Sequence, residues 1–358
     1  MTILVTGAAG FIGSNFVLDW FDQFDEDIVS LDLLTYAGNR GNLSPLDSNP
    51  HHHFIKGDIR DKGLISEVLK KFQVRAVIHF AAESHVDRSF CGPIDFIETN
   101  IVGTYHLLET VREYWNNLSD IPKKSFRFLH VSTDEVYGSL EKIDQAFTEM
   151  SQYRPNNPYS ASKAASDHLV RSWNQTYGLP ILIMHCSNNY GPYQFPEKLI
   201  PLSIMNALQA KPIPIYGDGQ HIRDWLYVKD HCRAIRVVLE KGQIGEIYNV
   251  GSRNEKTNLE VVETLCSILD ELKPKEDGSS YTNQITFVED RPGHDRRYAI
   301  DATKLERDLQ WKPQETFERG IRKTIEWYVD NQAWVTDIVS NCSKNLTQKS
   351  THENLSHG

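Results

Sequence analysis

The chain has 358 residues, of which 40% are hydrophobic and 24% are charged, with a formal net charge of −10. These values are typical of a globular protein large enough for two domains, and an acidic chain without a long Lys/Arg block is not expected to bind nucleic acid. No apolar run approaches the roughly 20 residues that a membrane-spanning helix needs, and a strand follows Met1-Thr2 at once, so we expect neither a membrane span nor a signal peptide.

The first predicted unit is a strand, a glycine-rich turn and a helix. The apolar run Ile3 to Thr6 enters a turn with Gly7, Gly10 and Gly13, and residues 14–24 then show helical spacing of apolar residues. Glycines let the backbone approach a pyrophosphate closely, and a helix N-terminus offers it free N–H groups and a favourable dipole. Because the spacing is GxxGxxG and not GxGxxG, the turn alone is a weak signal.

The second predicted strand indicates which dinucleotide binds. Ile28 to Leu31 ends at Asp32, close to the distance of about 20 residues expected for an acid that binds the adenosine ribose. Asp32 would repel a 2′-phosphate, and Leu33 and Leu34 offer it no basic partner. The sequence therefore predicts NAD and not NADP.

The following strands alternate with helices. Apolar runs at 54–59, 76–82, 126–131 and 181–186 are predicted strands, and helices are expected at 100–115 and 157–177. This alternation predicts an α/β fold, a Rossmann-type doubly wound parallel sheet. Ligands of such sheets bind beyond the carboxyl ends of the strands.

Five candidate catalytic side chains follow at that edge. Thr133, Asp134 and Glu135 come directly after the strand at 126–131. Tyr159 and Lys163 lie one turn apart on a helix that begins with Asn157 as N-cap and Pro158 at its first position, and that ends before Gly178. We expect the five to meet over a nicotinamide ring.

The alternation fades after Ser187, which predicts a division into domains. Residues 1–187 form the predicted NAD-binding domain, to which 218–250 returns with short strands at 223–228 and 246–250. Residues 188–217 and 251–335, with helices at 258–272 and 317–328, form a smaller mixed α/β domain for the substrate. Residues 341–358 are polar and are expected to be disordered.

Neither disulfides nor a metal site are expected. The five cysteines, Cys91, Cys186, Cys232, Cys266 and Cys342, are scattered and never form a CxxC pair, which indicates reduced thiols in a cytoplasmic protein. The run His51 to His53 could suggest a metal, but three consecutive residues cannot all face one way on a strand.

Several motifs together resemble the extended short-chain dehydrogenase/reductase superfamily: GAAGFIG at 7–13, Asp32, and YSASK at 159–163. Within it the chain resembles the dTDP-glucose 4,6-dehydratase family through STDEVYG at 132–138, NNYGPYQFPEKL at 188–199 and RPGHD at 291–295. The likeness runs from Thr2 to about Trp327. Related 4-epimerases lack the acid pair, and UDP-glucuronate decarboxylases typically have Ser where Asp134 stands, so both carboxylates favour elimination of water.

The resemblance implies NAD, a nucleotide-sugar substrate, and a homodimer joined by a four-helix bundle of the helices at 100–115 and 159–177. The implied cofactor residues are Gly7, Gly10, Phe11, Ile12, Gly13, Asp32, Leu33, Leu34, Thr35, Asp58, Ile59, Phe80, Ala81, Ala82, Thr99, Tyr159, Lys163 and Asn189. The implied substrate residues are Ser84, Thr133, Asn188, Lys198, Leu199, Pro214, Ile215, Tyr216, Arg223, Asn258, Asp290, Arg291 and His294. The two arginines suit a diphosphate, although either could instead form a structural ion pair.

The predicted reaction has three steps. Tyr159 takes the proton of the 4-hydroxyl while hydride passes from C4 to NAD, with Thr133 holding the oxygen. A tyrosine pKa of about 10 must fall by roughly three units, about 4 kcal/mol, which Lys163 and the nicotinamide can supply. Glu135 then removes the C5 proton, Asp134 protonates the departing 6-hydroxyl, and hydride returns to C6. The alternatives are an NAD-dependent 4-epimerase or decarboxylase, or a non-catalytic NAD-binding sensor.

Overall fold

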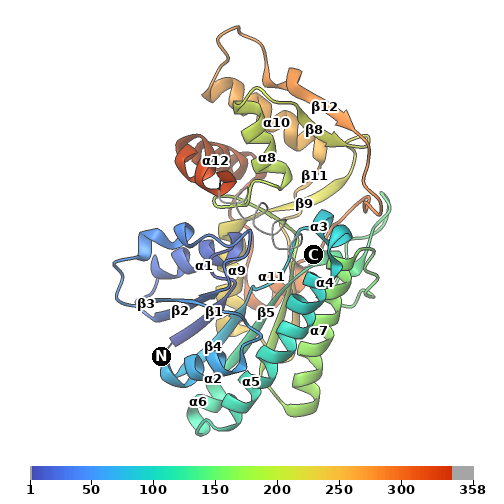
Figure 1. Ribbon diagram of the computed structural model, residues 1–358. Coiled ribbons are helices and arrows are strands. Elements are labelled where there is room, and N and C mark those ends of the chain that lie inside the picture. The colour runs from blue at the N-terminus through green and yellow to red at the C-terminus, as the bar shows by residue number, and fades with distance from the viewer. Residues whose placement is uncertain (1, 341–358) are drawn as a thin grey trace, which may run out of the picture.

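Seven parallel strands form the central sheet of the computed structural model, which describes residues 2–340 (Figure 1). Their order across the sheet is β10-β6-β5-β4-β1-β2-β3. The strands are β1 (Thr2–Thr6), β2 (Asp27–Asp32), β3 (His52–Lys56), β4 (Val74–His79), β5 (Arg127–Thr133), β6 (Ile181–Cys186) and β10 (Ile247–Val250). The chain runs outward from β1 to β3 and then returns to the other side of β1, so the predicted doubly wound sheet is confirmed. The polar tail predicted at 341–358 lies outside the described residues.

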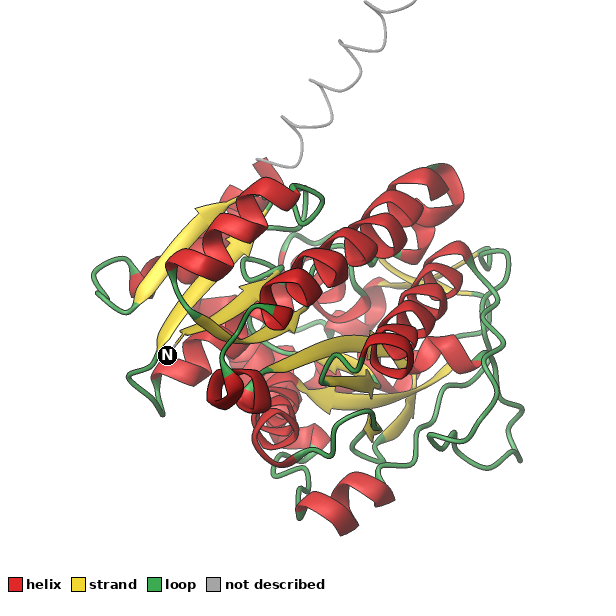
Figure 2. Cartoon of the chain, turned by 90° about the horizontal axis from the view of Figure 1, so that it is seen from below, coloured by secondary structure: helices red, strands yellow, loops and turns green. Residues whose placement is uncertain are grey.

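Helices cover both faces of the sheet (Figure 2). One face carries α1 (Phe11–Phe21), α9 (Val228–Lys241) and α11 (Thr303–Leu309), and the other carries α2 (Lys62–Lys71), α5 (Thr104–Asn116) and α7 (Pro158–Tyr177). Successive side chains of a strand point to opposite faces. Accordingly Ile3 and Val5 pack with α1 and α9, while Leu4 packs with the three helices opposite.

Local capping signals determined the helix ends well. α7 begins at Pro158, the Asn157 side chain accepts the N–H of Ser160, and Gly178 ends the helix with a φ of 73°. The helix expected from Ser14 begins earlier, at Phe11. Likewise a π-helical segment, Ile97–Gly103, precedes α5. Apolar spacing marks the helix residues that pack on the core, but not a first turn that lines a pocket. Both helical segments therefore begin earlier than predicted.

A second, smaller unit lies beyond the carboxyl ends of the strands, in the upper part of Figure 1. Its strands are β7 (Asn188–Tyr190), β8 (Ile213–Tyr216), β9 (Ile222–Tyr227), β11 (Glu255–Thr257) and β12 (Ile285–Val288), and its helices are α8 (Leu199–Leu208), α10 (Asn258–Leu272) and α12 (Phe317–Asp330). The expected return of two strands to the main sheet is half right. β10 pairs with β6, whereas β9 pairs with β7 and β11, because β7 leads the chain away from the sheet directly after β6.

Shorter segments complete the described chain: η1 (Arg40–Leu46), α3 (Val86–Cys91), α4 (Pro93–Phe96), α6 (Asp120–Ser125), η3 (Asp134–Tyr137) and η4 (Tyr281–Gln284). Among residues 2–340 we find no helix with the length and apolar character needed to cross a membrane. In a doubly wound sheet, ligands bind beyond the carboxyl ends of the strands, so a site is expected in the loops that follow these ends.

Candidate active site

One pocket opens at the carboxyl ends of β1, β4 and β5, where the direction of winding reverses. It is lined by all but one of the predicted cofactor residues: Gly7, Gly10, Phe11, Ile12, Gly13, Asp32, Leu33, Thr35, Asp58, Ile59, Phe80, Ala81, Ala82, Thr99, Tyr159, Lys163 and Asn189. Ser84, Thr133, Asn188 and Lys198 of the predicted substrate set line it too. The structure thus gathers residues from six strand ends around one space.

The glycine turn is built for close backbone approach. Gly7 has a φ of 70°, and a Cβ there would lie 2.6 Å from the backbone nitrogen of Ala81. A Cβ on Gly13 would lie 2.2 Å from the carbonyl oxygen of Gly7. The first turn of α1, which Gly10 caps, therefore faces the pocket with its N–H groups and the positive end of the helix dipole. This geometry suits a pyrophosphate.

Asp32 holds the loop that follows β2. Its carboxylate accepts the backbone N–H of Ala9 at 2.9 Å and that of Leu34 at 2.8 Å. Each oxygen keeps a further lone pair, so the carboxylate can still accept ribose hydroxyls. Leu34 is the exception among the predicted cofactor residues: in the described chain it does not line the pocket, and its backbone, with a positive φ of 57°, donates its N–H to Asp32.

The five candidate catalytic residues meet in the pocket. β5 ends at Thr133, and the single turn η3 then carries Asp134 and Glu135. The Thr133 hydroxyl lies 3.4 Å from Asp134 Oδ1, to which it donates, and accepts the N–H of Glu135 at 3.3 Å. The packing of α7 against β5 and η3 brings Tyr159 and Lys163 to the same place.

The two acids have different environments. Burial raises the pKa of Asp134 well above its ordinary value, and the carboxylates of Glu135 and Asp224 raise it further. Burial also raises the pKa of Glu135, but Lys198, Arg223 and Arg291 oppose this rise. The pair is therefore arranged to hold one protonated and one ionised carboxyl. Burial is the larger cause for Asp134, ahead of the neighbouring carboxylate from which the sequence predicted it.

Tyr159 and Lys163 are both buried. Burial and the Glu135 carboxylate raise the pKa of Tyr159 well above its ordinary value, while the neighbouring Thr133 side chain lowers it. Lys163 Nζ donates to the carbonyl of Val131 at 2.9 Å and lies 3.5 Å from His130 Nε2. Tyr159 thus becomes a base only if positive charge offsets its burial.

The remaining predicted substrate residues lie outside the lining of the pocket within the described chain: Leu199, Pro214, Ile215, Tyr216, Arg223, Asn258, Asp290, Arg291 and His294. Leu199 starts α8, Pro214 to Tyr216 belong to β8, and Asn258 starts α10. Arg223 is buried and donates to the carbonyl of Asp295 at 2.9 Å, and Arg291 pairs with Asp87 at 2.6 Å. Both arginines are nevertheless close enough to Glu135 to lower its pKa.

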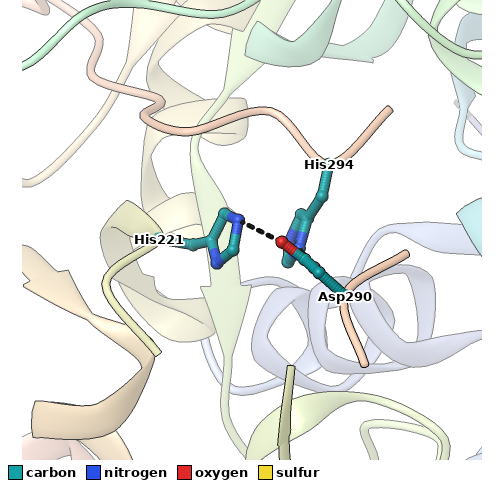
Figure 3. Close-up of side chains that lie close together, drawn as sticks. All are labelled: His221, Asp290 and His294. Atoms are coloured by element: carbon teal, nitrogen blue, oxygen red, sulfur yellow. Dashed lines mark hydrogen bonds and ion pairs between the residues drawn. The ribbon is translucent and has the colours of Figure 1, made fainter. Parts of the chain in front are cut away.

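Asp290 and His294 form a cluster with His221 (Figure 3). No motif in the sequence indicated His221 as a site residue. Asp290 bridges the imidazoles, at 3.2 Å from His221 Nε2 and 2.7 Å from His294 Nδ1, and the two rings stack with centroids 3.6 Å apart. Burial lowers the pKa of His294 to about 3, so the ring is neutral at neutral pH. The ligand atoms lie within 4.8 Å of one another, but both imidazoles are already paired with Asp290.

Other residues of the pocket were not predicted either: Leu31, Ala37, Gly38, Gly57, Glu83, Val131, Ser132, Cys186, Ser187, Gln194, Phe195 and Glu197. Glu197 accepts a hydrogen bond from the Tyr36 hydroxyl at 3.0 Å and pairs with Arg88 at 3.2 Å. Its position inside the motif at 188–199 was a usable signal. No sequence signal pointed to Gly38, although a Cβ at this position would lie 2.6 Å from Asp32 Oδ1.

A doubly wound sheet whose glycine turn, strand-end acid and Tyr–Lys pair share one pocket defines the short-chain dehydrogenase/reductase class of enzymes. Comparison of the sequence with family models narrows this class. The chain belongs to the GDP-mannose 4,6 dehydratase family, whose model matches residues 4–324.

Individual relatives separate the activities within this fold. The dTDP-glucose 4,6-dehydratase of Xanthomonas campestris pv. campestris is 58% identical over 338 residues, which cover 94% of this chain and 96% of the relative. The crystal structure of dTDP-glucose 4,6-dehydratase from Bacillus anthracis str. Ames in complex with NAD is 45% identical, covers 94% of this chain and 99% of that chain, and has a TM-score of 0.83. UDP-glucose 4-epimerase from Thermus thermophilus, in complex with NAD, is only 29% identical at a TM-score of 0.80, with 92% of this chain and 100% of that chain covered. The fold is thus common to both activities, whereas the sequence favours the dehydratases.

Proposed function

We propose that the protein is an NAD-dependent hydro-lyase that converts dTDP-glucose to dTDP-4-keto-6-deoxyglucose. The observation that carries this proposal is the Asp134–Glu135 pair at the end of β5, beside Tyr159 and Lys163. A 4-epimerase needs only the Tyr–Lys pair, whereas elimination of water needs an acid and a base. Similarity over nearly the whole chain to proteins named dTDP-glucose 4,6-dehydratase supports the same substrate.

The pocket fits NAD. The N-terminal turn of α1 suits the pyrophosphate, Asp32 suits the adenosine ribose hydroxyls and disfavours a 2′-phosphate, and Asp58 and Ile59 are at the adenine end. Bound NAD supplies the acceptor for the C4 hydride and, once reduced, the donor for C6. The protein's own groups handle the protons.

In the oxidation, Tyr159 removes the proton of the 4-hydroxyl. Thr133, whose side chain neighbours Tyr159, holds the C4 oxygen in line. The Lys163 ammonium stabilises the phenolate and so offsets the rise in the pKa of Tyr159 caused by burial and Glu135.

In the elimination, Glu135 removes the C5 proton that the neighbouring ketone has acidified. Asp134, which burial keeps protonated, gives its proton to the departing 6-hydroxyl, so that water leaves. Glu135 then returns that proton to C5. Tyr159 gives up the proton it took from the 4-hydroxyl and Asp134 regains one, so the net change in each turnover is the loss of one water. Lys198, Arg223 and Arg291 help to keep Glu135 ionised, and the same cations suit the substrate diphosphate.

We assign the other predicted residues to the walls around the nucleotide sugar: Ser84, Asn188, Leu199, Pro214, Ile215, Tyr216, Asn258, Asp290 and His294. In this scheme residues 1–187 and 228–250 form the NAD-binding domain, and 188–227 and 251–335 form the substrate domain. The position of β10 in the main sheet supports the assignment of 228–250, and the pairing of β9 with β7 and β11 supports the assignment of 218–227 to the substrate domain.

We also propose a homodimer in which α5 and α7 of two copies form a four-helix bundle. Exposed hydrophobic side chains on and just before these helices support it, since Ile97, Tyr105 and Tyr177 are 44%, 38% and 47% exposed. The described cysteines Cys91, Cys186, Cys232 and Cys266 are free thiols, which is consistent with a cytoplasmic protein.

Mass spectrometry of the sugar nucleotide tests the function. Incubation with dTDP-glucose and NAD should yield a product lighter by one water, and the Tyr159→Phe variant should yield none. A 4-epimerase would leave the mass unchanged, which would overturn the proposal. UDP-glucose and UDP-glucuronate in parallel reactions test the nucleotide and the decarboxylase alternative.

A further inference from the structure

A buried polar cluster that the proposed mechanism does not use lies beneath the Tyr159–Lys163 face of α7. Its members are His130 and Ser132 on β5, Asp167 on α7 and His185 on β6, and all are at most 3% exposed. Tyr159, Lys163 and Asp167 are spaced four residues apart, so they follow one another along a single face of the helix.

Asp167 is the centre of this cluster. Its Oδ1 lies 3.2 Å from His130 Nε2, and its Oδ2 accepts from Ser132 Oγ and lies close to His185 Nε2, each at 3.0 Å. His130 is also the residue that lies 3.5 Å from Lys163 Nζ. The same nitrogen, His130 Nε2, therefore faces both the buried carboxylate and the buried lysine.

We propose that Asp167 is a positioning residue whose carboxylate, one helical turn from Lys163 on α7, keeps Lys163 protonated so that Lys163 can stabilise the Tyr159 phenolate. The inference deepens the proposed function and rests on its assignment of Tyr159 as the base. The Asp167 carboxylate is the negative charge on which deprotonation of Tyr159 depends.

The charges around Lys163 support this assignment. His130 faces the ammonium from β5, Cys186 faces it from β6, and His79, whose pKa burial and the Lys163 charge lower, faces it from β4. Tyr159 and Asp167 lie one turn away on either side along α7. Burial lowers the pKa of Lys163, and Asp167 is the strongest opposing influence. Burial and the Lys163 charge lower the pKa of His130 to about 4, so this ring is neutral and adds no positive charge beside Lys163.

The carboxylate itself is secured as an anion. Burial raises the pKa of Asp167, but the close contacts with His130 and His185 outweigh burial and hold that pKa well below its ordinary value. A buried ammonium without a nearby anion would lose its proton. On the other side, Glu135 and Asp134 both raise the pKa of Tyr159, so a neutral Lys163 would leave the phenol protonated.

The test is a pH titration of Tyr159 in the NAD-loaded enzyme. Near-ultraviolet absorbance of the phenolate is measured for the unmodified protein and for Asp167→Asn, and in each case the signal of the matching Tyr159→Phe variant is subtracted. We expect Asp167→Asn to raise the pKa of Tyr159 by about one unit, or tenfold. In turnover, kcat should fall about tenfold at neutral pH and recover at higher pH, with KM unchanged.

The sign of the shift decides the question. If the only role of Asp167 is to accept hydrogen bonds, Lys163 stays charged in the variant. Loss of a nearby anion then lowers the pKa of Tyr159 or leaves it unchanged. Either result would overturn the proposal. Asp230→Asn is the matched control, because Asp230 is a buried carboxylate on α9 that accepts the N–H groups of Gln314 and Glu315. It should not move the pKa of Tyr159.

Two further variants guard against loss of the fold. If Asp167→Asn does not give a cooperative thermal transition, Asp167→Ser removes the same charge with a smaller side chain and should also raise the pKa of Tyr159, whereas Asp167→Glu keeps the charge and should retain the original value. The titration uses no sugar nucleotide. A shift without loss of water from dTDP-glucose would thus overturn the proposed function alone, and loss of water without a shift would overturn the role of Asp167 alone.

Discussion

Replacing Glu135 by glutamine should separate the oxidation from the elimination. The substitution keeps the shape of the side chain and removes its charge. A positioned general base contributes about 10²–10⁴ in rate, so kcat should fall by at least about 100-fold, equivalent to about 2.7 kcal/mol. The C4 oxidation should survive. Because the Glu135 carboxylate raises the pKa of Tyr159, its loss should even ease the first proton transfer.

Stopped-flow absorbance measures this directly. After the Glu135→Gln enzyme is mixed with dTDP-glucose, the absorbance of enzyme-bound NADH should rise towards one equivalent per site and decay slowly. The unmodified enzyme should show only a small transient, because hydride returns to C6 in each turnover. Normal turnover by Glu135→Gln, or loss of the NADH signal along with turnover, would refute this division of roles.

Asp134→Asn provides the matched comparison. It removes the acid and leaves Glu135 in place, so NADH should accumulate in this variant too. In deuterated water, however, Asp134→Asn should exchange the C5 hydrogen of the bound sugar, whereas Glu135→Gln should not. Mass spectrometry of the recovered sugar nucleotide distinguishes the two variants, and C5 exchange by Glu135→Gln would show that another group is the base.

Two further predictions concern stability and cofactor binding. Because the pKa of Asp134 is raised in the folded protein, folding has to protonate this carboxyl at any pH above the unfolded value of about 3.9, which costs stability. Asp134→Asn should therefore raise the Tm at neutral pH, and the gain should vanish below about pH 3.9; a constant gain would contradict this cause. Gly13→Ala places a Cβ 2.2 Å from the Gly7 carbonyl and should weaken NAD binding about 10-fold or more in calorimetry, since overpacking costs about 1–3 kcal/mol. Gly178→Ala is its control: nothing lies within 4 Å of the added Cβ, and the φ of 73° should cost about 1–2 kcal/mol of stability without affecting NAD.

The sequence alone determined the parts of this protein that depend on neighbours along the chain. Asn157, Pro158 and Gly178 mark both ends of α7 because capping is a local hydrogen-bonding problem. The same holds for the glycine turn, whose close approach to Ala81 admits no side chain at Gly7. Motifs of this kind were sufficient to predict the doubly wound sheet and most of the pocket.

The tertiary structure decided what depends on residues far apart in sequence. Leu34 stays outside the lining of the pocket, His221 joins Asp290 and His294, and Asp167 lies close to His130 beside Lys163. Strand order and helix packing produce these contacts, and no spacing along the chain encodes them. The pKa values of Asp134 and Tyr159 belong to the same class, because their largest cause is burial, which only the complete fold provides.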